Sequence, residues 1–346
     1  MRYNLSMTYA VYSHSTSNLG DEIQSIAALQ FIPQGAKCEL IKRDFPWNPR
    51  PAHHTRFLIA NGWFSHSGLC FTLPPTITPF FVSLHVSPEF RLSKSAIELL
   101  RKFGPVGCRD LHTLRRLRAE NIESYFSGCL TMTLRRSFAH TGGGGILNNC
   151  APPSVTLGRT TVSVSQMLPR IGIHADSRIH RTIEKIANNW RNRSVSDFNQ
   201  LPSVDRWLLT RFNDEQEHEE DHDRFSRARG LLKTYSTADA IFTTKLHCAI
   251  PGIAMGTPVA FFNPTNTPDP RFEGLEAFIS DNSGTDASKE PRTYDLTAWS
   301  DALSSLVARA IEMRANPLCF SKERHLLEDL KNAQRQWIDP KTWATL

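Results

Sequence analysis

The stretch ADAIFTTKLHCAIPGIAMGTPVAFF, residues 238–262, holds the pattern that decides the fold. An apolar run at Ala240–Thr243 stops at Lys245 and His247, small residues and a proline follow, and a second apolar run, VAFF, completes the stretch. Short apolar runs bounded in this way predict two buried strands of a parallel sheet, joined by a helix that begins at about Cys248. The stretch therefore predicts a βαβ unit with a lysine and a histidine where its first strand ends.

The same alternation of short apolar runs and helical patterns continues along most of the chain. Strands are predicted at 7–12, 56–61, 80–85, 106–108, 172–174, 205–210, 240–243 and 259–262, and helices at 21–31, 94–103, 110–120, 181–190 and 224–235. This order is typical of α/β proteins with parallel sheets. A break rich in Gly, Pro, Asn and Thr predicts a linker. We expect an N-terminal domain at 1–140, the linker at 141–165, a C-terminal domain at 166–320, and a C-terminal helix at 321–346 that packs back on the first domain.

Length and composition limit the kinds of protein this can be. A chain of 346 residues is long enough for two domains. Its 40 Lys and Arg against 34 Asp and Glu give a net charge of +6, which suits an anionic ligand, a nucleic acid or a membrane surface. Seven scattered cysteines without a CxxC pair favour a reducing compartment over a disulfide framework. Because no signal peptide and no apolar run near ~20 residues is visible, we expect a cytoplasmic protein without a membrane span.

The end of the Ala240–Thr243 strand is the strongest candidate site. On an extended chain, Lys245 and His247 point to the same side while Leu246 turns into the core. Open α/β sheets bind ligands at the carboxyl ends of their strands, where the next helix N-terminus favours anions. We therefore expect Lys245 to hold an anion and His247 to transfer protons. The structural alternative is a histidine satisfied by local hydrogen bonds and a lysine in solvent.

Two other stretches, SNLGDEIQS and VGCRDLHTLRRL, repeat the change from strand to turn to helix. Asn18 and Asp21 are predicted to hydrogen-bond hydroxyls of a polar ligand between the domains. An aspartate there repels phosphate, so a sugar fits better than a nucleotide. The structural alternative for Asp21 is stabilisation of the first helical turn, and Asp110, beside Arg109, is predicted to cap a helix.

The stretch HEEDH at 218–222 formally matches the zinc-protease signature H-E-x-x-H. Acidic residues crowd it on both sides, and no third ligand follows at the usual spacing. We expect a solvated acidic surface there and no metal site.

Several of these segments together resemble the polysaccharide pyruvyl transferase family. The resemblance rests on NLGDEIQS, on VGCRDLHTLRRLRAENI followed by SGCLTMTL, on DRFSRARGLLKTYSTADAIFTTKLHCAIPGIAMGTPVAFF, and on DPRFEGL at 269–275. It implies a GT-B-like fold, in which two Rossmann-like domains face a cleft. It also implies transfer of the enolpyruvyl group of phosphoenolpyruvate to two hydroxyls of a sugar, which releases phosphate and leaves a pyruvate ketal. Phosphoenolpyruvate is a donor substrate, and no cofactor is expected.

The resemblance also suggests roles for single residues. The family typically has Arg-Leu-His where this chain has Lys-Leu-His, and it implies that His247 is catalytic. Protonation of a methylene carbon and attack by a hydroxyl need an acid and base with a pKa near neutral, which histidine supplies. Because the donor carries a carboxylate and a phosphate, Lys245, Arg224 and Arg271 are expected to bind it. The residues expected on the acceptor side are Asn18, Asp21 and Arg109.

Three alternatives stay open at this point. A nucleotide-sugar glycosyltransferase would share the architecture, and the lysine in place of arginine suggests a non-catalytic glycan- or phosphate-binding relative. A nucleic-acid binder is suggested only by the pI of about 9.0. The chain has no motif of interleaved basic and aromatic residues, so no nucleic-acid partner is expected.

Overall fold

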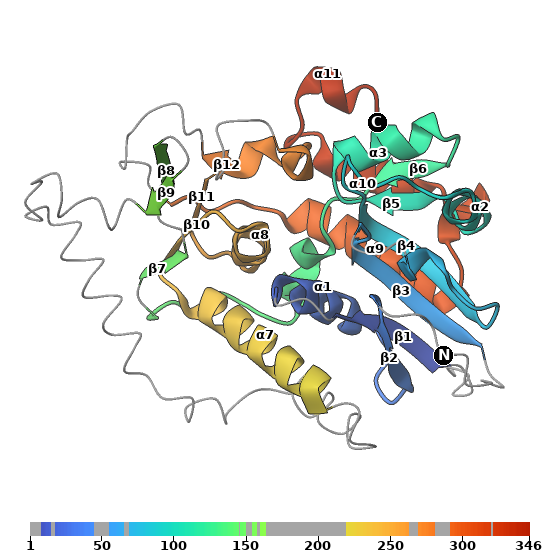
Figure 1. Ribbon diagram of the computed structural model, residues 1–346, viewed down its shortest axis with the longest axis horizontal. Helices are drawn as coiled ribbons and strands as arrows, with labels where there is room; N and C mark the ends of the chain where they lie inside the picture. The colour runs from blue at the N-terminus through green and yellow to red at the C-terminus, as the bar shows by residue number, and fades with distance from the viewer. Residues whose placement is uncertain are drawn as a thin grey trace, which may run out of the picture.

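The computed structural model describes the chain in segments that include two parallel β-sheets and their helices (Figure 1). The described residues are 8–14, 18–44, 55–65, 69–144, 146–149, 154–157, 160–163, 219–262, 269–280, 291–319 and 321–346. The elements predicted at 172–174, 181–190 and 205–210 lie outside these ranges. None of the helices in the described ranges is long and apolar enough to cross a membrane.

The first sheet has six strands in the order β2-β1-β3-β4-β5-β6, and every neighbouring pair is parallel. Its elements are β1 (Thr8–Ser13), α1 (Gly20–Leu29), β2 (Cys38–Lys42), β3 (Arg56–Trp63), β4 (Ile77–His85), α2 (Lys94–Lys102), β5 (Val106–Cys108), α3 (Leu111–Ala119) and β6 (Ser124–Phe126). All six residues of β1 are buried, as expected for a parallel strand covered on both faces. The predicted cap is confirmed, because the Asp110 carboxylate accepts a hydrogen bond from the backbone N–H of Thr113 at the start of α3.

The second sheet has four parallel strands in the order β12-β11-β10-β7. Its elements are β7 (Ile146–Asn149), α7 (Glu219–Thr237), β10 (Ala240–Thr243), α8 (Leu246–Met255), β11 (Val259–Phe262) and β12 (Ile279–Ser280). The strands predicted at 240–243 and 259–262 are confirmed. Strand β7 lies inside the segment predicted as linker and pairs with β10, so that segment contributes to the sheet. A separate antiparallel pair is formed by β8 (Ser154–Leu157) and β9 (Thr160–Ser163).

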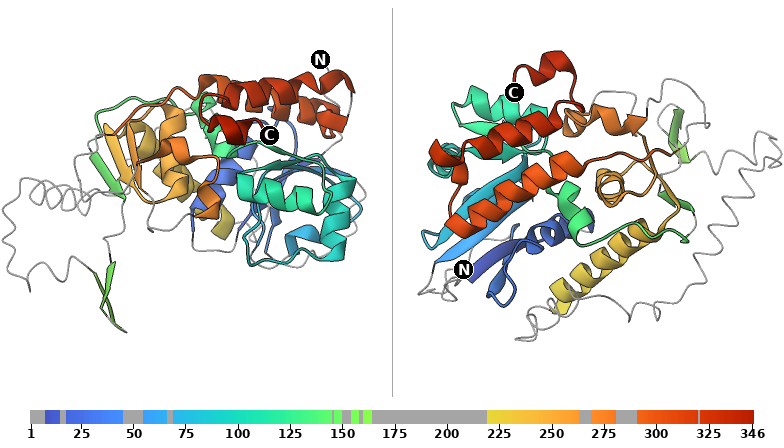
Figure 2. Two further views of the ribbon diagram at one scale, coloured as in Figure 1. Left: turned by 90° about the horizontal axis from the view of Figure 1, so that it is seen from above. Right: turned by 180° about the vertical axis from the view of Figure 1, so that it is seen from behind.

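The C-terminal helices α9 (Thr297–Met313) and α10 (His325–Gln334) lie side by side across the first sheet, and α11 (Pro340–Trp343) follows them (Figure 2). The indole N–H of Trp299 donates to the backbone carbonyl of Ser127, and the Gln334 amide donates to that of Phe126. Gly128 makes this packing possible, because it has a φ of +71° and a Cβ there would lie 2.5 Å from the Trp299 ring. These hydrogen bonds thus attach the C-terminal helices to the edge of the first sheet that strand β6 forms.

Candidate functional site

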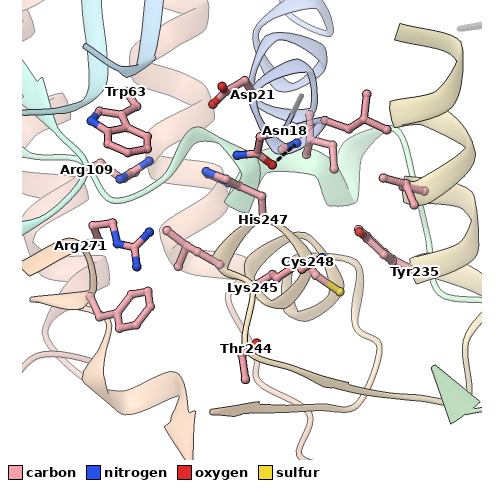
Figure 3. Close-up of a pocket in the computed structure, with 16 residues that line it drawn as sticks. Asn18, Asp21, Trp63, Arg109, Tyr235, Thr244, Lys245, His247, Cys248 and Arg271 are labelled. Carbon is pink, nitrogen blue, oxygen red and sulfur yellow. Dashed lines mark hydrogen bonds between the residues drawn. The ribbon is translucent and has the colours of Figure 1, made fainter. Parts of the chain in front are cut away.

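A pocket of about 550 Å³ lies where the carboxyl ends of strands from both sheets approach each other (Figure 3). This volume is in the range of small-molecule sites. The first sheet contributes the start of α1, the last residue of β3 and the residue that follows β5, and the second contributes the start of α8 and the 3-10 helix η5 (Pro270–Phe272). Six of the seven site residues predicted from the sequence line it, namely Asn18, Asp21, Arg109, Lys245, His247 and Arg271.

The backbone around His247 differs from the sequence prediction. The extended segment ends at Lys245, which is the N-cap of α8, and the helix begins at Leu246 rather than at about Cys248. His247 therefore projects from the first helical turn and does not share an extended face with Lys245. The backbone N–H of Lys245 donates to the hydroxyl of Thr243, which turns the chain out of β10 and into the helix. Both side chains still line the pocket.

His247 lies against the first residue of α1. A Cβ placed on Gly20 would come within 2.9 Å of the His247 Cβ and Cδ2 atoms, so only glycine allows the two helix starts to approach this closely. Glycine at this position therefore serves the contact as well as the turn predicted from the sequence. The imidazole points toward Arg109 and Trp63 (Figure 3).

The electrostatic surroundings of His247 favour the neutral ring. Its Nδ1 atom is buried and has no hydrogen-bond partner among the described residues. Burial of the ring, and next the positive charge of Arg109, lower the pKa of His247 to about 3, although Asp21 opposes the shift. The His247 ring is therefore neutral at neutral pH.

The two pocket arginines differ in how far their charge is already compensated. Arg271 hydrogen-bonds the carboxylate of Asp269 through Nε and Nη2, and its side chain is 44% exposed. Arg109 is almost fully buried, and its Nε is 3.8 Å from the carboxylate of Asp110, which is too far for a hydrogen bond. No hydrogen bond is made by the Arg109 Nε within the described part of the chain. Arg109 is thus the buried cation with the weaker internal partner.

Lys245 is exposed, in contrast to Arg109. It forms no ion pair with any carboxylate in the described ranges, so its charge is free to meet a ligand but is screened by solvent.

Asn18 and Asp21, predicted on the acceptor side, both lie at the start of α1. Asn18 is exposed, and its side-chain oxygen accepts a hydrogen bond from the backbone N–H of Gly20 at 3.1 Å. Asp21 is buried, accepts a hydrogen bond from Gln24, and lies 3.6 Å from the guanidinium of the buried Arg43. The sequence did not indicate this ion pair between Arg43 and Asp21.

Arg224 does not line the pocket. It projects from α7 to α1, where its guanidinium binds the buried carboxylate of Glu22 at 2.8–2.9 Å. The ring of His14 lies 3.7 Å from the same carboxylate. The structure therefore places Arg224 in an ion pair that ties the two halves of the chain together.

The sequence prediction missed Trp63, which lines the pocket, and His85, which lies behind it, and both residues end a strand. Trp63 is the last residue of β3 and lines the pocket, but the predicted strand ended two residues earlier. His85 is the last residue of β4, fully buried beside the Trp63 ring at 6.1 Å between ring centres. The rule that ligands bind at the carboxyl ends of parallel strands would have selected both residues had it been applied to β3 and β4.

The described residues include no group of three or more His, Cys, Asp or Glu side chains that could hold a metal ion. Of the HEEDH stretch, His218 lies outside the described residues, and 219–222 form the first turn of α7. The expected absence of a metal remains a prediction.

The family model of polysaccharide pyruvyl transferases matches residues 18–266, which is most of the chain. The chain belongs to this family. The matched segment of this polysaccharide pyruvyl transferase family member begins at Asn18 and contains every predicted pocket residue except Arg271.

Other comparisons add little to the family match. A crystal structure of a functionally uncharacterised protein from Klebsiella pneumoniae aligns with 75% of this chain and 84% of its own, at 14% identity and a TM-score of 0.37. A likeness this weak carries no argument about the family member described here. No curated protein matches the chain.

Proposed function

We propose that this member of the polysaccharide pyruvyl transferase family transfers the enolpyruvyl group of phosphoenolpyruvate to two hydroxyls of a sugar, forming a pyruvate ketal and releasing phosphate. The observation that carries the proposal is the position of His247, which shares one pocket with Arg109, Arg271 and Lys245. A donor with a carboxylate and a phosphate needs several cations in one place, and guanidinium groups bind both anions in a bidentate manner.

The donor site in this proposal centres on Arg109. It is buried and its Nε has no hydrogen bond in the described part of the chain, so an anion beside it would meet a strong, weakly screened charge. Arg271, in η5, and Lys245, at the N-cap of α8, would contribute further positive charge, and Arg271 shares its charge with Asp269. We therefore place Arg109 with the donor rather than with the acceptor, and we leave Arg224 out because of its bond to Glu22.

The acceptor site in this proposal is the part of the pocket lined by Asn18, Asp21 and Trp63. An amide and a carboxylate can hydrogen-bond sugar hydroxyls, and an indole face offers an apolar surface on which a sugar ring can rest. Figure 3 shows these three side chains on the same side of His247. A hydroxyl held there would face the imidazole.

The proton balance of the reaction gives His247 its role. Each of the two sugar hydroxyls loses one proton: one proton ends on the methylene carbon of the donor, which becomes a methyl group, and the other leaves with the phosphate. In the free pocket His247 is neutral because burial and Arg109 lower its pKa to about 3. An anionic donor would offset the charges of Arg109 and Arg271 and raise this pKa, so that the ring can carry a proton from a hydroxyl to the carbon.

The finer description of the fold and setting belongs to the same proposal. We infer a GT-B-like arrangement, which is supported by two parallel sheets whose strand ends meet at the pocket. We also propose that the protein acts in the cytoplasm without a cofactor, a nucleic-acid partner or a catalytic metal.

The test is an acceptor screen. The protein would be incubated with phosphoenolpyruvate and a panel of glycans, and released phosphate would be measured together with the mass gain of the sugar. His247→Gln is the matched control, because the amide keeps the polarity but cannot carry the proton, and its rate should fall by about 10²–10⁴. Equal rates in the two proteins would contradict the proposal. Transfer from a nucleotide sugar, with no reaction of phosphoenolpyruvate, would favour a glycosyltransferase.

A further inference from the structure

His85 is a buried histidine that the proposed reaction does not use. It ends β4, and its side chain is fully buried. Its Nδ1 lies 2.5 Å from one carboxylate oxygen (Oδ2) of Asp110, and its Nε2 has no partner among the described residues. His85 does not line the pocket. Any effect on a ligand must therefore pass through another residue.

The Asp110 carboxylate connects His85 to the pocket. Its Oδ1 accepts the hydrogen bond from the Thr113 N–H at 2.8 Å that caps α3. Its Oδ2 binds His85 and also lies 3.8 Å from the Nε of Arg109. Burial raises the pKa of Asp110, but the hydrogen bond with His85 and the charge of Arg109 lower it more, so the carboxylate stays ionised.

The geometry around this carboxylate is unusual for two adjacent residues of opposite charge. An arginine and a carboxylate that are both buried normally pair through close hydrogen bonds, often in a bidentate manner. Here the close hydrogen bond goes to His85, and the Arg109 Nε is left without one in the described ranges. His85 thus occupies the carboxylate oxygen that would otherwise pair with Arg109.

We propose that His85 is a positioning residue that holds the Asp110 carboxylate away from Arg109, and so keeps the Arg109 guanidinium available to an anion in the pocket. The inference rests on the proposed function in one respect, because it takes phosphoenolpyruvate as the natural anion. The role itself applies to any small oxyanion that Arg109 can bind.

The test compares variants that keep or remove the donor on His85. In His85→Leu the freed Asp110 carboxylate should pair with Arg109, and binding of phosphoenolpyruvate should weaken by about 10-fold or more, the usual effect of losing a charged hydrogen bond. In His85→Asn the amide can still donate to Asp110, so binding should stay within about threefold of wild type. Both variants would be titrated by calorimetry, with inorganic phosphate as a second probe.

A double variant separates positioning from a structural role. Asp110→Asn keeps the helix cap but removes the charge, because asparagine caps helices as well as aspartate does. In His85→Leu with Asp110→Asn, anion binding should therefore return to within about threefold of wild type. A protein that merely loses packing at His85 would not recover. Should His85→Leu fail to fold, Asp110→Asn alone serves, and weaker anion binding in that variant would overturn the proposal.

The outcomes also separate this inference from the proposed function. If wild type binds phosphoenolpyruvate and His85→Leu binds it equally well, the positioning role is overturned and the proposed function stands. If wild type binds phosphate but not phosphoenolpyruvate, and His85→Leu loses phosphate, the positioning role stands and the proposed donor is wrong. If wild type binds neither anion, Arg109 is not an anion site, and the positioning role is overturned.

Discussion

The pKa of His247 leads to a prediction about stability that needs no substrate. In the unfolded chain a histidine titrates at about 6.5, whereas in the folded protein burial and then Arg109 lower the pKa of His247 to about 3. Because the folded pKa is the lower one, the unfolded state binds more protons below about pH 6.5. The stabilising contribution is thus present above the unfolded pKa and is lost as the pH falls toward the folded pKa.

The size of the effect follows from these two values. Between about pH 7.5 and about pH 5, protonation of His247 in the unfolded chain lowers the free energy of unfolding by about 2 kcal/mol. His247→Gln removes the titrating ring, so over the same interval wild type should lose about 2 kcal/mol more than the variant. His85, whose pKa is also lowered by burial and by Arg109, is present in both proteins and cancels in the difference.

Urea unfolding followed by tryptophan fluorescence, at both pH values and for both proteins, measures this difference directly. Equal losses of stability in wild type and His247→Gln would refute the reasoning, because the imidazole would then titrate in the folded protein as it does in the unfolded chain. A larger loss in the variant would reverse the sign and place His247 near a net negative charge.

Three further predictions concern the contacts around the pocket. Gly20→Ala puts a methyl group 2.9 Å from the His247 ring, so turnover in the phosphate-release assay should fall by about tenfold or more while the helical circular dichroism signal is kept. Arg224→Met leaves the Glu22 carboxylate buried without its cation and should lower the free energy of unfolding by about 3 kcal/mol in urea, with part of the loss recovered by adding Glu22→Gln. Lys245→Ala should weaken calorimetric binding of phosphoenolpyruvate less than Arg109→Gln does, because the lysine is exposed and the arginine is buried; the reverse order would contradict our placement of the donor.

Much of the fold could be predicted from the sequence where apolar runs are long or sharply bounded. The strands at Val106–Cys108, Ala240–Thr243 and Val259–Phe262 are confirmed residue for residue. Strands β6 and β12 were missed, and the two residues of β12 are too few to show a periodic pattern. Each is fixed by pairing with a neighbouring strand rather than by its own composition.

The candidate site could be predicted as far as strand ends are visible in the sequence. The strand-end rule selected Lys245, His247 and Arg109 as site residues, and all three line one pocket although they come from two sheets. It could not show that Arg224 turns away, because its partner Glu22 is 202 residues distant and only the folded chain brings them together. It also could not show that the Asp110 cap binds His85 through its second oxygen.

The charges in the pocket suggest how proton transfer is restricted to the donor-bound state. Without a ligand, Arg109 and Arg271 help to keep His247 neutral, so the ring cannot protonate anything at neutral pH. An uncharged sugar changes none of these charges and leaves the ring neutral. In the proposed reaction, a ligand with both a carboxylate and a phosphate would offset the charges of both arginines and raise the pKa of His247 toward the range in which it can act as an acid. In this proposal, the cations that would bind the donor also set the pKa of His247, and we expect the acid form to exist only when there is a methylene carbon to protonate.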